Sequence, residues 1–330
     1  MLKEDRASRT QETRQEPEPP AVGSPSCFSI SAFLRFSIYQ KERFPLLAHG
    51  PLIAAFSACA VSFSSLLRQA PVPSWQMYLT AFAVCLLMFL QLRIADEFKD
   101  AAEDARWRPY RPVPRGLVTL RELRIVFIIA ALVQTLLVVA LDVRLLAVLA
   151  IAWTYLALMS VEFFCRDWLK RRPVIYLLTH MGIMPLVDFF ATACEWLPRA
   201  GHPPQGLGWF LTASFCNGIV IEIGRKLRQP QDEEEGVETY SKLWGKKGGG
   251  IVWWCAVIAT SLCAVQAAVG AGPGSLVGIA IALPLVMVVA LPVTWLYHHR
   301  NLSGKKIEMI SAVWTLVLYL TLGLIPLFLR

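Results

Sequence analysis

One short segment of the chain carries a high concentration of acidic side chains. Between Asp96 and Asp104, five carboxylates stand against a single lysine, Lys99. On a helix, Asp96, Asp100 and Asp104 would share one face at steps of about 6 Å along the axis. Like charges at that spacing repel, so the pattern favours a helix end that binds cations. Magnesium is suited to it, because it takes one or two carboxylates and completes its octahedron with water and phosphate oxygens.

The next segment adds arginines on a restricted backbone. Three prolines and a glycine lie within residues 106–116, and they leave that loop few accessible conformations. Arg108 and Arg111 are thereby presented beside the carboxylates, and guanidinium groups bind phosphate oxygens in bidentate fashion. The combination predicts a site for a magnesium diphosphate. The alternative is a solvated helix end, with carboxylates paired to Lys99 and Arg108, followed by an ordinary basic loop.

The elements that must position these residues are membrane helices. Hydrophobic residues make up 55% of the 330-residue chain and charged residues 17%, whereas soluble domains carry about 25% charged residues. Several runs reach the roughly 20 apolar residues that a membrane-spanning helix needs, and strands would leave backbone groups unpaired in lipid. The runs without Asp, Glu, Lys or Arg are 75–92, 145–160, 173–187, 250–297 and 309–329. We therefore expect an all-α polytopic membrane protein, a bundle of helices around a central cavity.

Loop charge supports a count of nine transmembrane helices. The basic connections alternate with connections poor in Lys and Arg, which under the positive-inside rule places the N-terminus and the basic loops in the cytoplasm. An odd helix count then places the C-terminus on the opposite side. The expected helices are 46–68, 75–95, 124–141, 144–163, 173–194, 207–225, 250–270, 275–297 and 309–329, and the basic connections are 106–124, 166–172, 225–247 and 298–306.

Two features outside the helices complete the organisation. Residues 1–27 are expected to form a disordered tail because they are polar and rich in proline, and residues 28–330 form the membrane domain. Within that domain, 28–45 is expected to include a short interfacial helix. The net charge of +8 is attributed to loops that face anionic lipid headgroups of the bilayer, so no nucleic-acid partner is expected.

The acidic segment and the loop after it together resemble the first motif of the UbiA superfamily of membrane prenyltransferases. That motif has the form N/D-D-x-x-D-x-x-x-D, followed by R/K-P-x-R-P-x-P-x-G. Here the first part is Asp96-Glu97-x-x-Asp100-x-x-x-Asp104, and the second part spans 108–116. Glu97 stands where the family usually has Asp. The resemblance extends over nine helices and therefore over most of the chain beyond residue 45.

The resemblance implies a further phosphate contact in the loop at 166–172. This loop looks like the family's Y-x-x-x-L-K element, whose lysine contacts phosphate. Lys170 matches that lysine, while Phe164 or Cys165 stands in place of the tyrosine. A positive-inside loop explains the same residues equally well.

The family's second aspartate-rich motif, D-x-x-x-D before a G-x-x-T segment, is altered here. Gly236-Val-Glu-Thr239 looks like the G-x-x-T segment. Aligned from it, Asp232 takes the second aspartate position and Arg228 takes the first. Glu222, at the end of the preceding helix, is the candidate to replace the missing carboxylate. The alternative for the acidic run at 232–235 is a solvated start of a short helix.

Among the polar residues inside the expected helices, one acidic and one amide side chain stand out. Asp188 and Asn217 are candidates to line the cavity, because an acidic side chain in lipid is costly and usually faces the bundle interior or a watery cavity.

The function that the resemblance implies is magnesium-dependent transfer of an isoprenyl group from its diphosphate to a hydrophobic acceptor, with an aromatic acceptor as one option. Magnesium would be held by Asp96, Asp100, Asp104, Glu222 and Asp232, which form the catalytic set. Arg108, Arg111 and Lys170 would bind the diphosphate. A terpene cyclase with the same diphosphate site is one alternative. A transporter is another, but it would place paired charges or broken helices near the bilayer midplane, and the charges here gather at helix ends.

Overall fold

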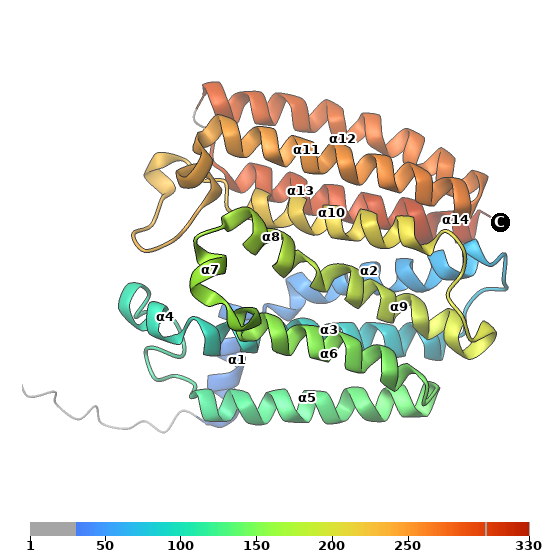
Figure 1. The fold of residues 1–330 in the computed structure, drawn as a ribbon, viewed down its shortest axis with the longest axis horizontal. Helices are drawn as coiled ribbons and strands as arrows, with labels where there is room; N and C mark the ends of the chain where they lie inside the picture. Colours follow the sequence, from blue (N-terminus) through green and yellow to red (C-terminus); the bar gives the residue numbers. More distant parts are fainter. Residues whose placement is uncertain (1–30, 301, 330) are drawn as a thin grey trace, which may run out of the picture.

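The computed structural model describes residues 31–300 and 302–329, and every regular element in that part of the chain is helical (Figure 1). Within these described residues, eight segments are long and apolar enough to cross a membrane. A shorter apolar helix, α6 (Leu145–Ser160), has 16 residues. The long segments are α2 (Leu46–Leu67), α3 (Trp75–Lys99), α5 (Leu120–Leu141), α8 with α9 (Pro173–Ala200), α10 (Leu207–Arg225), α11 (Tyr240–Ala271), α12 (Pro273–His299) and α13 to α14 (Lys305–Phe328).

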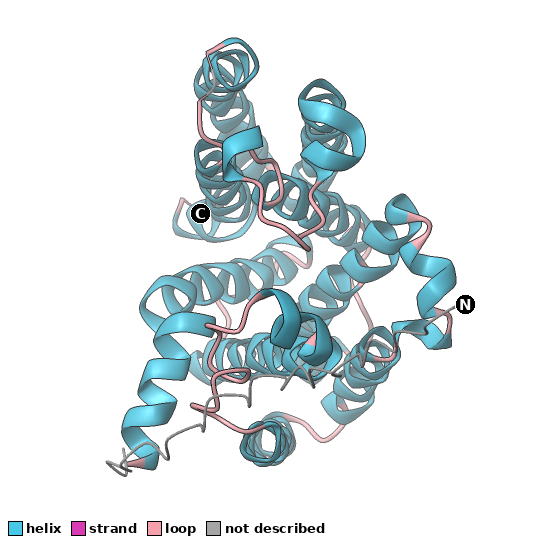
Figure 2. Ribbon diagram, turned by 90° about the vertical axis from the view of Figure 1, so that its left-hand side faces the viewer, coloured by secondary structure: helices cyan, strands magenta, loops and turns pink. Residues whose placement is uncertain are grey.

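The expected all-α polytopic fold is confirmed. Eight long segments together with α6 account for the nine expected helices, with α6 falling short of the length of the others. The long helices lie side by side (Figure 1), and Figure 2 looks onto one end of the bundle. The tail expected at 1–27 lies outside the described residues.

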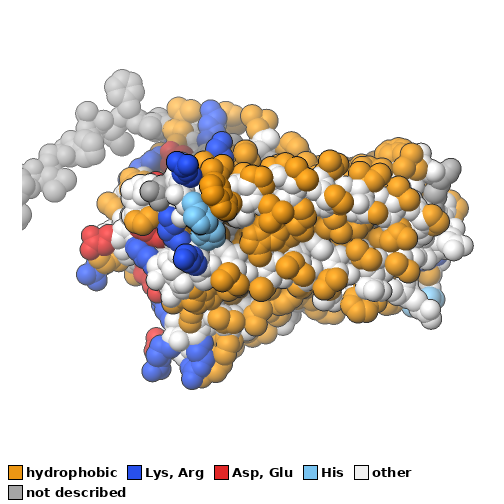
Figure 3. All heavy atoms as spheres, turned by 90° about the horizontal axis from the view of Figure 1, so that it is seen from above, with side chains coloured by type: hydrophobic (Ala, Val, Ile, Leu, Met, Phe, Trp, Pro, Cys, Tyr) orange, Lys and Arg blue, Asp and Glu red, His pale blue; other side chains and the backbone are white. Residues whose placement is uncertain are grey.

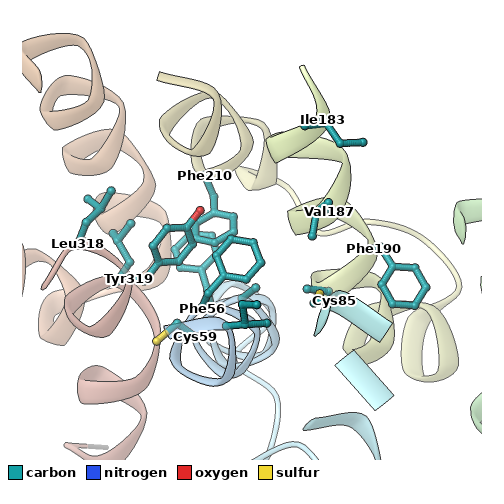
Figure 4. Packing of buried hydrophobic residues seen from close by; sticks show 14 of the residues in the cluster. Phe56, Cys59, Cys85, Ile183, Val187, Phe190, Phe210, Leu318 and Tyr319 are labelled. Carbon is teal, nitrogen blue, oxygen red and sulfur yellow. The ribbon is translucent and has the colours of Figure 1, made fainter. Parts of the chain in front are cut away.

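The interior of the bundle is filled by aromatic and aliphatic side chains from helices far apart in the sequence. Phe56 of α2, Phe210 of α10 and Tyr319 of α13 meet there, with ring centroids 4.9 Å apart for Phe56 and Tyr319 and 5.8 Å apart for Phe210 and Tyr319 (Figure 4). All three are buried. This packing ties the first, middle and last thirds of the chain together.

Charged side chains gather at one end of the bundle, and hydrophobic side chains cover most of the remaining visible surface (Figure 3). The short helices α4 (Ala101–Trp107) and α7 (Arg166–Lys170) lie at this charged end, as does the α10–α11 connection (Figure 1). The C-terminus lies at the other end (Figure 1). The candidate motifs therefore share one end of the molecule.

Helix α1 (Ala32–Arg43) lies at this charged end, within the interfacial segment expected at 28–45. Its Tyr39 is buried with Val118 and Leu123, which flank the start of α5. Its Arg35 forms an ion pair of 2.7 Å with Glu122, and Glu122 also completes a capping box with Thr119. These contacts anchor both α1 and the end of the proline-rich loop onto α5.

Two of the expected helices differ from those in the structure: one is divided into two helices, and the other begins earlier and bends. The helix expected at 173–194 is divided into α8 (Pro173–Met181) and α9 (Ile183–Ala200). The Tyr155 hydroxyl donates a hydrogen bond of 2.6 Å to the Thr179 carbonyl, which a continuous helix would pair with the amide of Ile183. Gly182 leaves room for that hydroxyl, since a Cβ there would lie 2.2 Å from it.

The helix expected at 250–270 begins earlier, at Tyr240, because the Thr239 side chain caps it by accepting from the Lys242 amide. It bends at Gly245, whose φ of 70° is a conformation that glycine adopts at low cost.

Candidate active site

The acidic segment sits where α3 ends. Helix α3 stops at Lys99, Asp100 leaves helical geometry with φ −97° and ψ 7°, and α4 follows. The turn nevertheless continues, because the Asp100 amide bonds to the Asp96 carbonyl at 2.9 Å and the Asp104 amide bonds to the Asp100 carbonyl at 2.8 Å. The three aspartates keep nearly helical spacing, but they differ in burial.

Asp104 is buried and lies between the two arginines of the following loop. Arg108 donates to one of its oxygens at 2.8 Å, and Arg111 donates to the other at 2.6 Å. Each arginine side chain stays about one fifth exposed. The carboxylate thus fixes two guanidinium groups through one N–H-bearing nitrogen each, and each guanidinium carries further N–H donors. This geometry makes Asp104 a positioning residue for Arg108 and Arg111.

Asp96 and Asp100 are more accessible. Asp96 has looser contacts, at 3.6 Å from Arg93 and 3.7 Å from Lys99. Asp100 forms no ion pair with any residue that the structure describes. Burial raises the pKa of Asp100, and the neighbouring Asp96, Asp104 and Glu103 carboxylates add to this effect, while Lys99 opposes it. A cation bound here would remove that repulsion.

No three His, Cys, Asp or Glu side chains of the described residues come together as a preformed metal site. That arrangement is compatible with magnesium, which binds through one or two carboxylates plus phosphate oxygens and water. Asp96 and Asp100 fit this requirement. Among the described residues, Asp96, Asp100, Asp104, Glu222 and Asp232 do not form one cluster of ligands, and their predicted role in holding magnesium stays a prediction.

A polar network lies behind Lys99. The Lys99 ammonium donates to the Tyr176 hydroxyl at 3.0 Å and lies 3.7 Å from Glu162, while the Tyr176 hydroxyl donates to Glu162 at 3.2 Å. His180 stacks on Tyr176 with ring centroids 3.8 Å apart and lies 3.5 Å from Glu162. Since Lys99 also contacts Asp96, this network links α3 to α8 directly beside the candidate metal ligands.

The turn that carries Glu162 is in the left-handed region. Glu162, Phe163 and Phe164 have φ values of 53°, 51° and 59°, although none is glycine. Such residues cost about 1–2 kcal/mol each in this conformation. Glu162 is buried at the end of the turn, in contact with Lys99 and Tyr176. Strain of this kind persists where the surrounding contacts fix it, often at functional sites.

Lys170 lies beside the acidic segment. Its ammonium forms an ion pair with Glu103, and Arg166 approaches the same carboxylate at 3.5 Å. The hydrogen bond from Lys170 lowers the pKa of Glu103. Helix α7 therefore places Lys170 at the charged end close to α4, and the side chain is 39% exposed, so it remains accessible to a ligand.

Glu222 lies at the charged end of α10. It pairs with Arg225 at 2.6 Å and with Lys226 at 2.9 Å. Arg225 in turn lies close enough to Asp96 for the two charges to interact. The end of α10 thus faces the first motif, with Arg225 contributing positive charge to the shared site.

The α10–α11 connection, which carries the second motif, contacts the segment of the first motif through Gly236. Gly236, with φ 71°, packs so closely on Trp107 that a Cβ there would lie 2.4 Å from the indole. Trp107 directly precedes Arg108. Asp232 lies elsewhere on this connection, 3.5 Å from the Ser303 hydroxyl between α12 and α13. The G-x-x-T segment therefore contacts the residue just before the arginine loop, while Asp232 contacts the connection between the last helices.

Asp188 and Asn217 lie in the bundle interior. The Tyr319 hydroxyl donates to Asp188 at 2.6 Å, and Asn217 exchanges hydrogen bonds with Thr315 at 3.1 and 3.2 Å. Both residues are fully buried. They join α9 and α10 to α13, and whether they also line a substrate cavity stays a prediction.

The model of the UbiA prenyltransferase family matches residues 55–320, which is well over half of the chain. The chain belongs to this family. It is therefore a prenyltransferase, and its relative among curated proteins is the digeranylgeranylglyceryl phosphate synthase of Korarchaeum cryptofilum (strain OPF8). The two are 27% identical over 216 residues, which cover 64% of this chain and 70% of the relative.

Two solved structures share the UbiA fold with this chain. One is the apo structure of a UbiA homologue from Aeropyrum pernix K1, with a TM-score of 0.63 and 14% identity, covering 81% of this chain and 94% of the other. The second comes from a study of digeranylgeranylglyceryl phosphate synthase in membranes, with a TM-score of 0.61 and 15% identity, covering 89% and 99%. At these identities the likeness shows the fold alone.

Several residues of this UbiA site were not predicted from the sequence. Arg43 of α1 forms an ion pair with Glu97, the residue that stands in place of the family's aspartate, and Glu97 is buried. Tyr176 and Glu162 join Lys99. An acidic residue such as Glu162 at the end of an apolar run was a usable signal, whereas nothing in the spacing connects Arg43 to Glu97.

Proposed function

We propose that this protein transfers an isoprenyl group from its diphosphate to a hydrophobic acceptor, with magnesium as the divalent metal. The observation that carries the proposal is the buried Asp104 carboxylate, which holds Arg108 and Arg111. Asp104 follows the accessible Asp100 by about one helical turn and Asp96 by about two. Two oriented guanidinium groups beside two available carboxylates suit a metal diphosphate, because arginine binds phosphate oxygens and the two carboxylates would hold magnesium, which would offset diphosphate charge.

The chain's own residues would act on the leaving group. Arg108 and Arg111 bind diphosphate oxygens and take up the negative charge that develops when the allylic C–O bond breaks, with Lys170 as a third cation. Asp104 keeps the two arginines in place, so little reorganisation accompanies bond breaking. Asp96 and Asp100 would hold magnesium, which when bound neutralises further diphosphate charge as a Lewis acid. Lys99, Tyr176 and Glu162 fix the end of α3 that carries these two aspartates.

The departing diphosphate leaves an allylic carbocation that must meet the acceptor before water does. The apolar interior of the bundle, with its aromatic side chains, excludes water and favours a cation through ring faces. The acceptor then attacks the carbon and loses its proton. The relative's name makes a prenylated glyceryl phosphate a reasonable acceptor class to test beside aromatic compounds.

The test is direct product analysis. Purified protein would be incubated with isoprenyl diphosphates of several lengths and magnesium, with prenylated glyceryl phosphate acceptors, with aromatic acceptors, or with no acceptor. Mass spectrometry should find an acceptor joined to the isoprenyl group together with released diphosphate. A cyclised hydrocarbon formed without acceptor would favour the cyclase instead. Absence of any magnesium-dependent release of diphosphate would contradict the proposal.

A further inference from the structure

A pocket lies between α11 and α12, at the same charged end but outside the site described above. Its volume is about 500 Å³, within the range of small-molecule sites. Apolar, aromatic and histidine side chains line it together: Gly250, Ile251, Trp254, Leu291, Pro292, Thr294, Trp295, His298 and His299.

A glycine run shapes this pocket. Gly248, Gly249 and Gly250 follow the bend of α11 at Gly245. A Cβ at Gly250 would lie 2.6 Å from the Nε2 atom of His298, so only glycine lets α12 bring this imidazole so close. Nδ1 of His298 is buried without a hydrogen-bond partner among the described residues. The close approach therefore places an imidazole with unused hydrogen-bonding capacity at the pocket.

The side chains that line the pocket change from apolar to polar along α12, toward the charged end. Leu291 and Pro292 of α12 supply an apolar wall toward the membrane interior, whereas Ile251 of α11 follows Gly250 and lies at the level of His298. Trp254 and Trp295 come next. The indole of Trp254 donates to Thr294 at 3.3 Å, and Trp295 stacks on His299 with ring centroids 4.9 Å apart. Tryptophan is typical of the membrane–water interface.

Positive charge stands at the polar end. Lys246 and Lys247 lie near enough to His298 to interact with its ring, and Lys247 is exposed. Figure 3 shows histidine side chains beside Lys and Arg where the hydrophobic surface gives way to the charged end. From membrane interior to surface, the order is apolar wall, indole rings, then imidazoles and ammonium groups. A glycerophospholipid has the matching order of acyl chain, glycerol and phosphate.

We propose that the α11–α12 pocket binds an anionic phospholipid. The phosphate would face His298, His299 and Lys247, and one acyl chain would lie along Leu291 and Pro292. Basic pockets between transmembrane helices at the membrane surface bind anionic headgroups. The lipid would brace the glycine-weakened start of α11, whose Gly249 packs on Leu227 of the α10–α11 connection. This inference does not depend on the proposed reaction.

The experiment compares lipid binding by the full chain and three variants. Lys247→Glu reverses one exposed charge at the pocket. Ile251→Trp narrows the pocket beside the imidazoles, at a position that is 63% exposed, and keeps every charge. The matched control, Arg121→Glu, makes the same charge reversal on exposed α5, at the opposite edge of the bundle (Figure 1). Native mass spectrometry and thermal unfolding would be measured with phosphatidylglycerol, phosphatidylcholine or inorganic phosphate.

We expect phosphatidylglycerol to bind and stabilise the wild type and the Arg121→Glu control, while phosphatidylcholine and inorganic phosphate do neither. Affinity for phosphatidylglycerol should fall at least about fivefold in Lys247→Glu, since each basic residue near the surface contributes about 1 kcal/mol, and it should also fall in Ile251→Trp. Equal loss in Arg121→Glu would mean non-specific attraction and would overturn the proposal. Equal stabilisation by inorganic phosphate, or unchanged affinity in both pocket variants, would overturn it too.

Discussion

Arg111 donates a hydrogen bond of 2.6 Å to the buried carboxylate of Asp104. Arg108 occupies the other oxygen of the same carboxylate at 2.8 Å. Asp104 belongs to the same sequence motif as Asp96 and Asp100, but its contacts differ from theirs. It orients the arginine loop, while the other two aspartates stay available to a cation.

The free energy of unfolding should distinguish the role of Asp104 from that of Asp100. Asp104→Asn should lower the free energy of unfolding by about 2 kcal/mol, because two charge-assisted hydrogen bonds lose their anionic acceptor. Asp100→Asn should leave it unchanged or slightly higher, because an unpaired carboxylate leaves a repelling cluster. Thermal unfolding in detergent without magnesium measures both. Equal destabilisation by the two substitutions would contradict the division of roles.

Arg111→Lys tests whether the guanidinium fork matters beyond its charge. Lysine keeps the positive charge but cannot bind Asp104 and a phosphate through a planar fork. We expect KM for the isoprenyl diphosphate to rise about tenfold, equivalent to about 1.4 kcal/mol, with protein yield and helicity maintained. Steady-state kinetics with Arg115→Lys as the matched control would show it, since Arg115 pairs with Glu42 away from Asp104. Identical kinetics for both variants would remove Arg111 from the diphosphate site.

The left-handed conformation of residues 162–164 leads to a prediction about the stability of the protein and not about its activity. Phe164 has φ 59° and is 83% exposed, so its side chain contributes little packing. Phe164→Gly should be more stable than Phe164→Ala by about 1 kcal/mol, because only glycine adopts this conformation without strain. Comparing the two variants cancels the loss of the phenyl ring. A more stable alanine variant would mean that the turn relaxes to ordinary geometry.

The helices were largely predictable from the sequence, because hydrophobic length and loop charge respond to the bilayer. Helix α10 has the bounds that were expected, 207–225. The break at Gly182 was not predictable, since it depends on a hydroxyl from Tyr155, far away in the chain.

Within the site, spacing identified the acidic segment and the arginine loop but did not assign their roles. A carboxylate four residues before an arginine has the same spacing whether it binds metal or holds that arginine. The pair of Arg43 with Glu97 and the left-handed conformation of Glu162 depend on tertiary contacts, for which a single sequence carries no pattern.

Membrane orientation is a separate prediction from the alternation of basic loops. In a cysteine-free background, Ala102→Cys at the charged end should resist an impermeant thiol reagent in intact cells and react after permeabilisation. Gln205→Cys, exposed in the α9–α10 connection, should react from outside and serves as the control. The opposite labelling pattern would show that the charged end faces outward.

The most direct test of the account is prenyl transfer by Asp100→Ala. With isoprenyl diphosphate, acceptor and magnesium, wild type should form product and the variant should not, although it folds and inserts normally. A non-hydrolysable diphosphate analogue with magnesium should stabilise wild type by about 2.7 kcal/mol at a hundredfold excess over its Kd, and this stabilisation should largely disappear in the variant. If Asp100→Ala turned over as fast as the wild type and was stabilised equally by the analogue with magnesium, the diphosphate site at the end of α3 would be contradicted.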